Sequence, residues 1–114
     1  CHSINRHVPA IRTTSFSDLI IGTVDGTSMP RAVETKLYKH FIRCGYDVML
    51  NDPFKGGYIT RHYHNVSKQI YTIQLEMSKD LYLDPSSNKI EKQKATDLIG
   101  HLKEAVVIMH KELS

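Results

Sequence analysis

The first residue that could carry chemistry is a single carboxylate, Glu76. It lies in a run from Gln69 to Met77 in which apolar and polar side chains alternate, which is typical of a β-strand. Glu76 would share one face of that strand with Thr72 and Gln74. A carboxylate partly withdrawn from water suits a general base that acts near neutral pH. The alternative is a Glu exposed at the edge of a sheet, without a function.

A second group is the segment GGYITRHYH, residues 56–64. Two adjacent glycines, Gly56 and Gly57, allow the backbone to approach a ligand closely. Arg61 presents a planar fork of donors that matches the two oxygens of a carboxylate. We therefore expect this segment to be a loop that recognises a small carboxylate. A flexible loop with a solvated Arg61 is the alternative.

The third group consists of histidines. His2 would lie at the end of a buried strand, where one ring nitrogen could bind a metal. His62 and His64 are two residues apart, which on a strand would put them on one face. A site made of these three histidines is a further interpretation, because a catalytic zinc takes three protein ligands and keeps an open position. His101 falls in a helical segment and is expected to be solvated.

The elements that must position these residues predict an α/β fold with a mostly parallel sheet flanked by helices. Residues 18–23 and 46–50 form short apolar runs typical of buried strands, and a helical pattern lies between them. Strand, helix and strand in that order favour α/β architecture. A final helix is predicted from about residue 90 to 112. We expect residues 1–114 to form one domain.

Composition excludes several classes of protein. The net charge is only +3 and the basic residues are scattered, which disfavours a nucleic-acid partner. No apolar stretch approaches the ~20 residues that span a bilayer, so no membrane association is expected. The two cysteines form no C-x-x-C motif or disulfide framework, and a reducing, cytoplasmic location is expected.

Three stretches of the chain resemble the N-formylglutamate amidohydrolase family. CHSI at the start resembles the segment D-C-H-S-M of that family, and DLIIGTVDGTSMP resembles its segment D-I-V-I-G-D-x-x-G-T-S. The longest match is NDPFKGGYITRHYHNVSKQIYTIQLEMSKDLYLDP, which resembles the signature N-x-P-Y-x-G-G-Y-I-T-R-H-Y and H-A-L-Q-L-E-I-N-R-x-L-Y-M-D. The similarity extends from Cys1 to about Pro85.

The resemblance implies a metal-dependent hydrolase that cleaves N-formyl-L-glutamate, or a similar N-acyl amino acid, during histidine degradation. It also implies a fold like that of the zinc carboxypeptidases, zinc or another divalent metal as cofactor, and His2 as a metal ligand. Glu76 would be the catalytic base and Arg61 would bind a substrate carboxylate. The remaining pocket residues carried over are Asn51, Gly57 and Thr60.

Two positions depart from the family pattern. Thr23 stands where the family usually has Asp, and Met29 stands where it often has Cys. These differences imply an altered pocket or a different N-acyl substrate.

The family's other metal ligands precede the His-Ser segment, which His2 begins in this chain. We therefore expect the chain to be the C-terminal portion of a longer amidohydrolase domain, with an incomplete site and little activity alone. Apolar surface facing the missing half would favour self-association or association with that half. A non-catalytic domain that binds small carboxylates is the alternative function.

Overall fold

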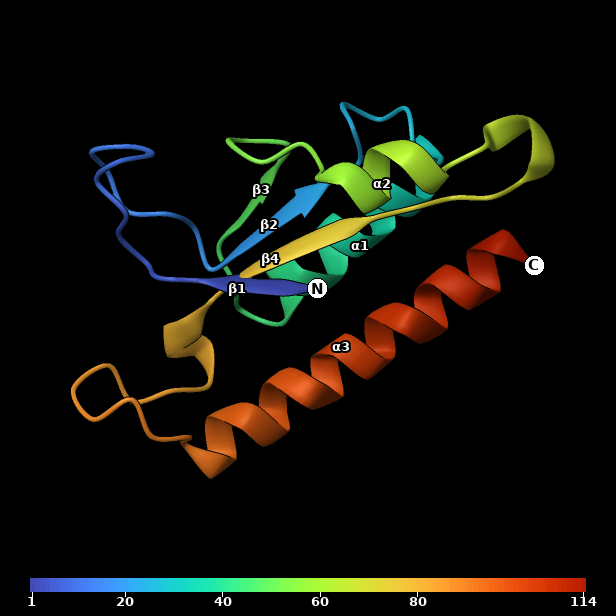
Figure 1. Ribbon diagram of the computed structural model, residues 1–114. Helices are drawn as coiled ribbons and strands as arrows, with labels where there is room; N and C mark the ends of the chain where they lie inside the picture. The colour runs from blue at the N-terminus through green and yellow to red at the C-terminus, as the bar shows by residue number, and fades with distance from the viewer.

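A four-stranded sheet forms the centre of the computed structural model, which describes residues 1–114 (Figure 1). The strands lie side by side in the order β1-β4-β2-β3. Their bounds are His2–Ile4 for β1, Leu19–Gly22 for β2, Val48–Leu50 for β3 and Gln74–Ser78 for β4.

The sheet is mixed, and the expectation of parallel strands holds for two of its three strand pairs. The β1–β4 and β2–β3 pairs are parallel, but the central β2–β4 pair is antiparallel. A parallel pair needs a crossover that returns the chain to the start of the sheet. The connection from β3 to β4, residues 51–73, stays instead at the end of the sheet where β3 stops, so β4 runs back in the opposite direction.

Two helices cover one face of the sheet. α1 spans Arg31–Arg43 and α3 spans Lys92–Leu113. Both contribute to one buried cluster with the alternate residues of β2 and β4 that point toward them, and they also contact each other. In Figure 1, α3 runs along the molecule as the longest element. The buried cluster between the two helices and the sheet consists of Leu19, Ile21, Met29, Val33, Leu37, Phe41, Val48, Leu75, Met77, Leu98 and Ala105.

The ends of α1 follow from its flanking residues. Pro30 precedes the first helical residue, where its missing N–H costs nothing. Gly45, with a φ of +95°, ends the helix in a conformation that favours glycine. α1 therefore begins beside the end of β2 and returns the chain to the start of β3.

The opposite face of the sheet carries the predicted base. Ile20 and Glu76 are cross-strand partners, so they share the face that α1 and α3 leave uncovered. The short helix α2, Tyr58–Tyr63, lies at the end of the sheet where β2 and β3 stop. We call the end of the sheet where β2 and β3 stop the site end, and we call the end where they start the opposite end.

No helix combines the length and apolar character needed to cross a bilayer.

An ion-pair network closes the opposite end of the sheet. Arg6 Nε and Nη2 donate to the two carboxylate oxygens of Asp80 at 2.9 and 2.7 Å, and Nη2 also donates to Asp18 at 2.7 Å. These bonds lower the pKa of the Asp80 carboxyl and raise the pKa of the Arg6 guanidinium. The network joins the segment after β1 to the residues before β2 and after β4.

Replacing Asp80 by Asn should reduce the free energy of unfolding by about 1–2 kcal/mol at neutral pH, because it removes a charge-assisted pair that is partly screened by solvent. The folded pKa of Asp80 lies below its ordinary value of 3.8. Its contribution is therefore complete above that value and is lost as the pH falls through the lowered pKa. Urea unfolding between neutral and acidic pH measures this. The matched control Asp25→Asn removes an exposed ion pair with Lys55, and an equal loss in that variant would contradict the assignment.

Candidate active site

The structure brings the predicted base and the predicted metal ligand into direct contact. His2 and Glu76 are register partners on β1 and β4, and His2 Nδ1 lies 2.9 Å from Glu76 Oε2. The Glu76 side chain is 10% exposed, whereas the His2 side chain is 73% exposed. The sheet therefore holds a largely buried carboxylate beneath an accessible imidazole.

A chain of hydrogen bonds links Glu76 to the start of α2. Gln74 Nε2 donates to Glu76 Oε1 at 3.2 Å, so both carboxylate oxygens of Glu76 are engaged. Gln74 Oε1 accepts a hydrogen bond from the backbone N–H of Gly57 at 2.6 Å. The predicted catalytic residue and the predicted pocket residue Gly57 are thus parts of one network at the site end.

The segment 56–64 is largely helical, which corrects the expectation of a loop. α2 is only six residues long, too short for a helical period to show in the sequence. Gly56, with a φ of +145°, makes the turn into it, and a Cβ at this position would lie 3.0 Å from the Thr60 side chain. The glycine is therefore required by backbone conformation and by close contact.

The two remaining predicted residues of this segment lie on different sides of α2. Thr60 is buried, and its carbonyl accepts hydrogen bonds from Thr72 Oγ1 at 2.6 Å and from His64 Nδ1 at 3.0 Å. Arg61 is exposed, and its Nε donates to the carbonyl of Gly56 at 2.7 Å. This bond orients the guanidinium and leaves its two terminal nitrogens available to a ligand.

The structure does not support the three-histidine site. His62 lies in α2 and His64 directly follows it, so the two are not alternate residues of one strand. His62 stacks on Tyr58 with ring centroids 4.8 Å apart, and His64 is bonded to the carbonyl of Thr60. No group of three potential metal ligands includes His2 or either of these residues. That interpretation is wrong because it assumed an extended backbone.

Asn51 joins the loops that follow β2 and β3. Its side-chain oxygen accepts from the backbone N–H groups of Thr23 at 2.8 Å and Asp25 at 3.1 Å, and its amide donates to Thr23 Oγ1 at 3.1 Å. Thr23 is fully buried and donates its hydroxyl to Glu34 of α1. Contact between Asn51 and a substrate stays a prediction, and the structure shows it positioning the loops at the site end.

Only one group of three potential metal ligands occurs in the chain, and it lies elsewhere. His40, Cys44 and Glu104 have ligand atoms within 4.8 Å of one another. His40 and Cys44 lie at the C-terminal end of α1, which packs on the face of the sheet opposite to Glu76. Near Glu76, His2 is the single accessible imidazole in a predicted ligand position.

Comparison with known proteins identifies the family. The sequence profile described as N-formylglutamate amidohydrolase matches residues 1–83. The chain belongs to the N-formylglutamate amidohydrolase family. The N-formylglutamate deformylases of Pseudomonas putida and of Pseudomonas aeruginosa are 36% and 37% identical to it over 84 residues. These 84 residues are 73% of this chain and 32% of each relative, so the chain spans about a third of the length of these curated relatives.

A solved structure shares the fold. The N-formylglutamate amidohydrolase from Ralstonia eutropha JMP134 superposes with a TM-score of 0.70 at 22% identity, over 87% of this chain and 37% of that one. The mixed sheet with its flanking helices is therefore an arrangement found in an N-formylglutamate amidohydrolase.

Sequence reasoning missed two features of the molecule. His101 was expected to be solvated, but it is half-buried, and its Nδ1 is hydrogen-bonded to the Tyr46 hydroxyl oxygen at 2.7 Å. The group formed by His40, Cys44 and Glu104 was also missed. The spacing of His40 and Cys44, four residues apart on a helix, could have indicated a pair on one face, but Glu104 is distant in sequence.

Proposed function

We propose that the chain is part of a metal-dependent amidohydrolase that removes the formyl group from N-formyl-L-glutamate, or the acyl group from a similar N-acyl amino acid. Family membership and the names of the Pseudomonas relatives support an amidohydrolase. The single observation that carries the assignment of the site is the contact between His2 and Glu76 on the face of the sheet opposite to α1 and α3.

Each residue has a role that its geometry permits. Glu76 accepts a proton from the attacking water and passes it to the departing amine, because it is largely shielded from solvent and held on both oxygens. Arg61 binds the substrate carboxylate with its free terminal nitrogens. Gly57 and Thr60 shape the pocket, and Asn51 fixes the loops beside it.

The residue type near Glu76 suits a divalent metal, but the chain offers fewer ligands there than a catalytic zinc needs. His2 offers one accessible imidazole, whereas a catalytic zinc takes about three protein ligands. A bound zinc, or another divalent cation, would polarise the acyl carbonyl and acidify a coordinated water. The other ligands would come from parts of the enzyme outside this chain, which would then be the C-terminal portion of the domain. The likeness to zinc carboxypeptidases stays a prediction.

Association with the rest of such an enzyme is compatible with the free edge of the sheet. β1 pairs with β4 on one side and has no strand on the other. An unpaired edge presents backbone N–H and carbonyl groups to another strand. We therefore expect the remaining part of the enzyme, or a second copy of the chain, to lie against β1.

A non-catalytic domain that binds a small carboxylate is the second candidate. It is favoured by the free terminal nitrogens of Arg61 and by the single imidazole at the site. Such a domain would bind its ligand equally well in the presence of a chelator, whereas the amidohydrolase requires its metal.

A chimeric enzyme tests the proposed function. Residues 1–83 of this chain replace the matching segment of the Pseudomonas putida deformylase, which supplies the parts that this chain lacks. The chimera should release formate from N-formyl-L-glutamate, lose that activity to a chelator and regain it with zinc. Residues 1–114 alone should show little turnover. A folded, zinc-loaded chimera that binds N-formyl-L-glutamate without hydrolysing it would favour the binding domain instead.

A further inference from the structure

We propose that His40, Cys44 and Glu104 form a second zinc site, which links α1 to α3 away from the candidate active site. The three side chains offer one nitrogen, one sulfur and one oxygen, all within 4.8 Å of one another. His40 and Cys44 come from the last turn and the C-cap of α1, and Glu104 comes from the middle of α3.

The imidazole of His40 is held in an orientation that suits a ligand. Its side chain is 8% exposed, and Nε2 lies 2.9 Å from the carbonyl oxygen of His101. Because a carbonyl only accepts, Nε2 carries the proton and Nδ1 carries a lone pair. Both ring nitrogens lie 3.9 Å from the Cys44 sulfur. Metal-binding histidines commonly donate their other ring N–H to a backbone carbonyl in this way.

The spacing of the ligand atoms is close to that of a bound zinc. Two ligands of a tetrahedral zinc, with metal distances of about 2.0–2.3 Å, lie about 3.3–3.6 Å apart. The 3.9 Å between His40 Nδ1 and the Cys44 sulfur is a few tenths of an ångström longer, and the Cys44 side chain would rotate toward Nδ1 to share a metal with it. Glu104 Oε2 lies 3.8 Å from His40 Nε2, the nitrogen that donates to His101. The Glu104 side chain is 63% exposed, and it would rotate to reach a metal bound at Nδ1.

The charges around Cys44 favour a cation. Cys44 and Glu104 offer a sulfur and a carboxylate oxygen within 4.8 Å of each other, so a thiolate here would lie close to a carboxylate. A divalent cation between the sulfur and the carboxylate would compensate both. The metal bound there would hold Cys44 as the thiolate.

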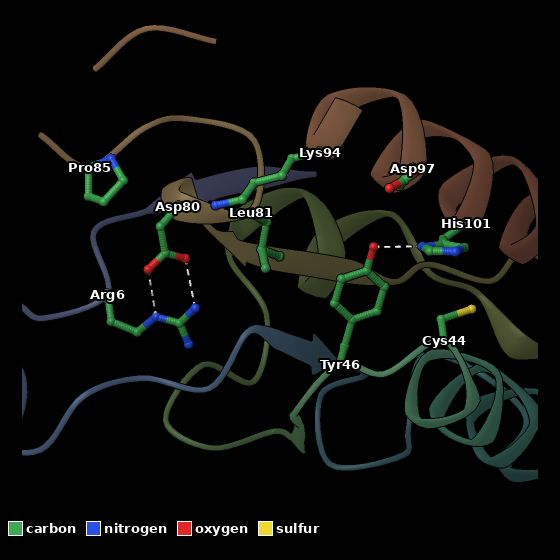
Figure 2. Close-up of a pocket in the computed structure, with 9 residues that line it drawn as sticks. All are labelled: Arg6, Cys44, Tyr46, Asp80, Leu81, Pro85, Lys94, Asp97 and His101. Carbon is green, nitrogen blue, oxygen red and sulfur yellow. Dashed lines mark hydrogen bonds and ion pairs between the residues drawn. The ribbon is translucent and has the colours of Figure 1, made fainter. Parts of the chain in front are cut away.

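A pocket of about 550 Å³ borders the site at Cys44. Figure 2 shows Cys44 and His101 at one end of this pocket and the Arg6–Asp80 pair at the other. A metal and a water that completes its coordination could enter from this side.

The donor set selects the kind of metal. A thiolate, an imidazole and a carboxylate suit zinc and similar transition metals. Magnesium and calcium prefer oxygen ligands alone, so neither should bind here.

Cobalt(II) reports on the site because it can replace zinc and gives a thiolate-to-metal absorption band. Residues 1–114, titrated with cobalt chloride, should show this band at one equivalent, and zinc should abolish it while magnesium should not. Cys44→Ser should remove the band. Glu104→Gln should keep the fold and weaken cobalt binding by more than about 10-fold.

The chain contains a natural control, because Cys1 is its other free thiol. Cys1→Ser should leave the band and the affinity unchanged. A band that persists in Cys44→Ser and disappears in Cys1→Ser would overturn the proposal. Absence of any thiolate band in the folded chain would overturn it equally.

Discussion

Replacing Glu76 by Gln in the chimeric deformylase is expected to lower kcat for N-formyl-L-glutamate by about 100- to 10,000-fold. The amide keeps the size of the side chain and can still bond to Gln74 and His2, but it cannot accept the proton of the attacking water. Since the change affects proton transfer rather than binding, KM should change little. Steady-state kinetics of formate release measure both constants.

Asp47→Asn is the matched control for this variant. Asp47 is an exposed carboxylate that precedes β3 at the opposite end of the sheet. Its replacement should leave kcat within about twofold of the parent. Equal losses of kcat in both variants, or a Glu76→Gln variant that keeps most of its activity, would contradict the role of Glu76 as the base.

Replacing Phe41 by Ala should lower the free energy of unfolding of residues 1–114 by about 3–5 kcal/mol. Phe41 is 2% exposed and belongs to the cluster that α1 buries against the sheet. Its ring centroid lies 5.0 Å from that of His40 and 6.2 Å from that of Tyr46. Truncation would leave a cavity between these groups, and urea unfolding followed by circular dichroism would measure its cost.

Ile42, the next residue in α1, provides the control for the Phe41→Ala variant. Ile42→Ala removes apolar atoms from a residue on the same helix turn that is 43% exposed, and it should cost less than about 1 kcal/mol. Equal destabilisation by the two variants would show that burial against the sheet is not what stabilises α1.

The elements with a strong apolar pattern could be predicted from the sequence. The run before Gly22 is β2, the helical pattern that ends near Gly45 is α1, and the final helix extends from Lys92 to Leu113. Local patterns do not encode the direction in which a strand enters a sheet. The antiparallel pairing of β2 with β4 depends on the path of residues 51–73, which was not visible in the sequence.

The residues of the candidate site that lie within continuous family motifs could be predicted from the sequence. The motif supplied Glu76 and His2 separately, and the register of β1 with β4 brings them together across 74 residues of sequence. The helical conformation of residues 58–63 was missed because one and a half turns are too short to show a period. The misassignment of His62 and His64 followed from that error.

Metal content and turnover of the chimera after His2→Ala test the central claim most directly. The chimera does not contain Glu104 of this chain, because the segment taken from this chain ends at residue 83. If His2 and Glu76 form one part of a metal-dependent active site, the variant should lose its catalytic zinc and its hydrolysis of N-formyl-L-glutamate together. Full zinc content and full turnover in a folded His2→Ala chimera would contradict the account.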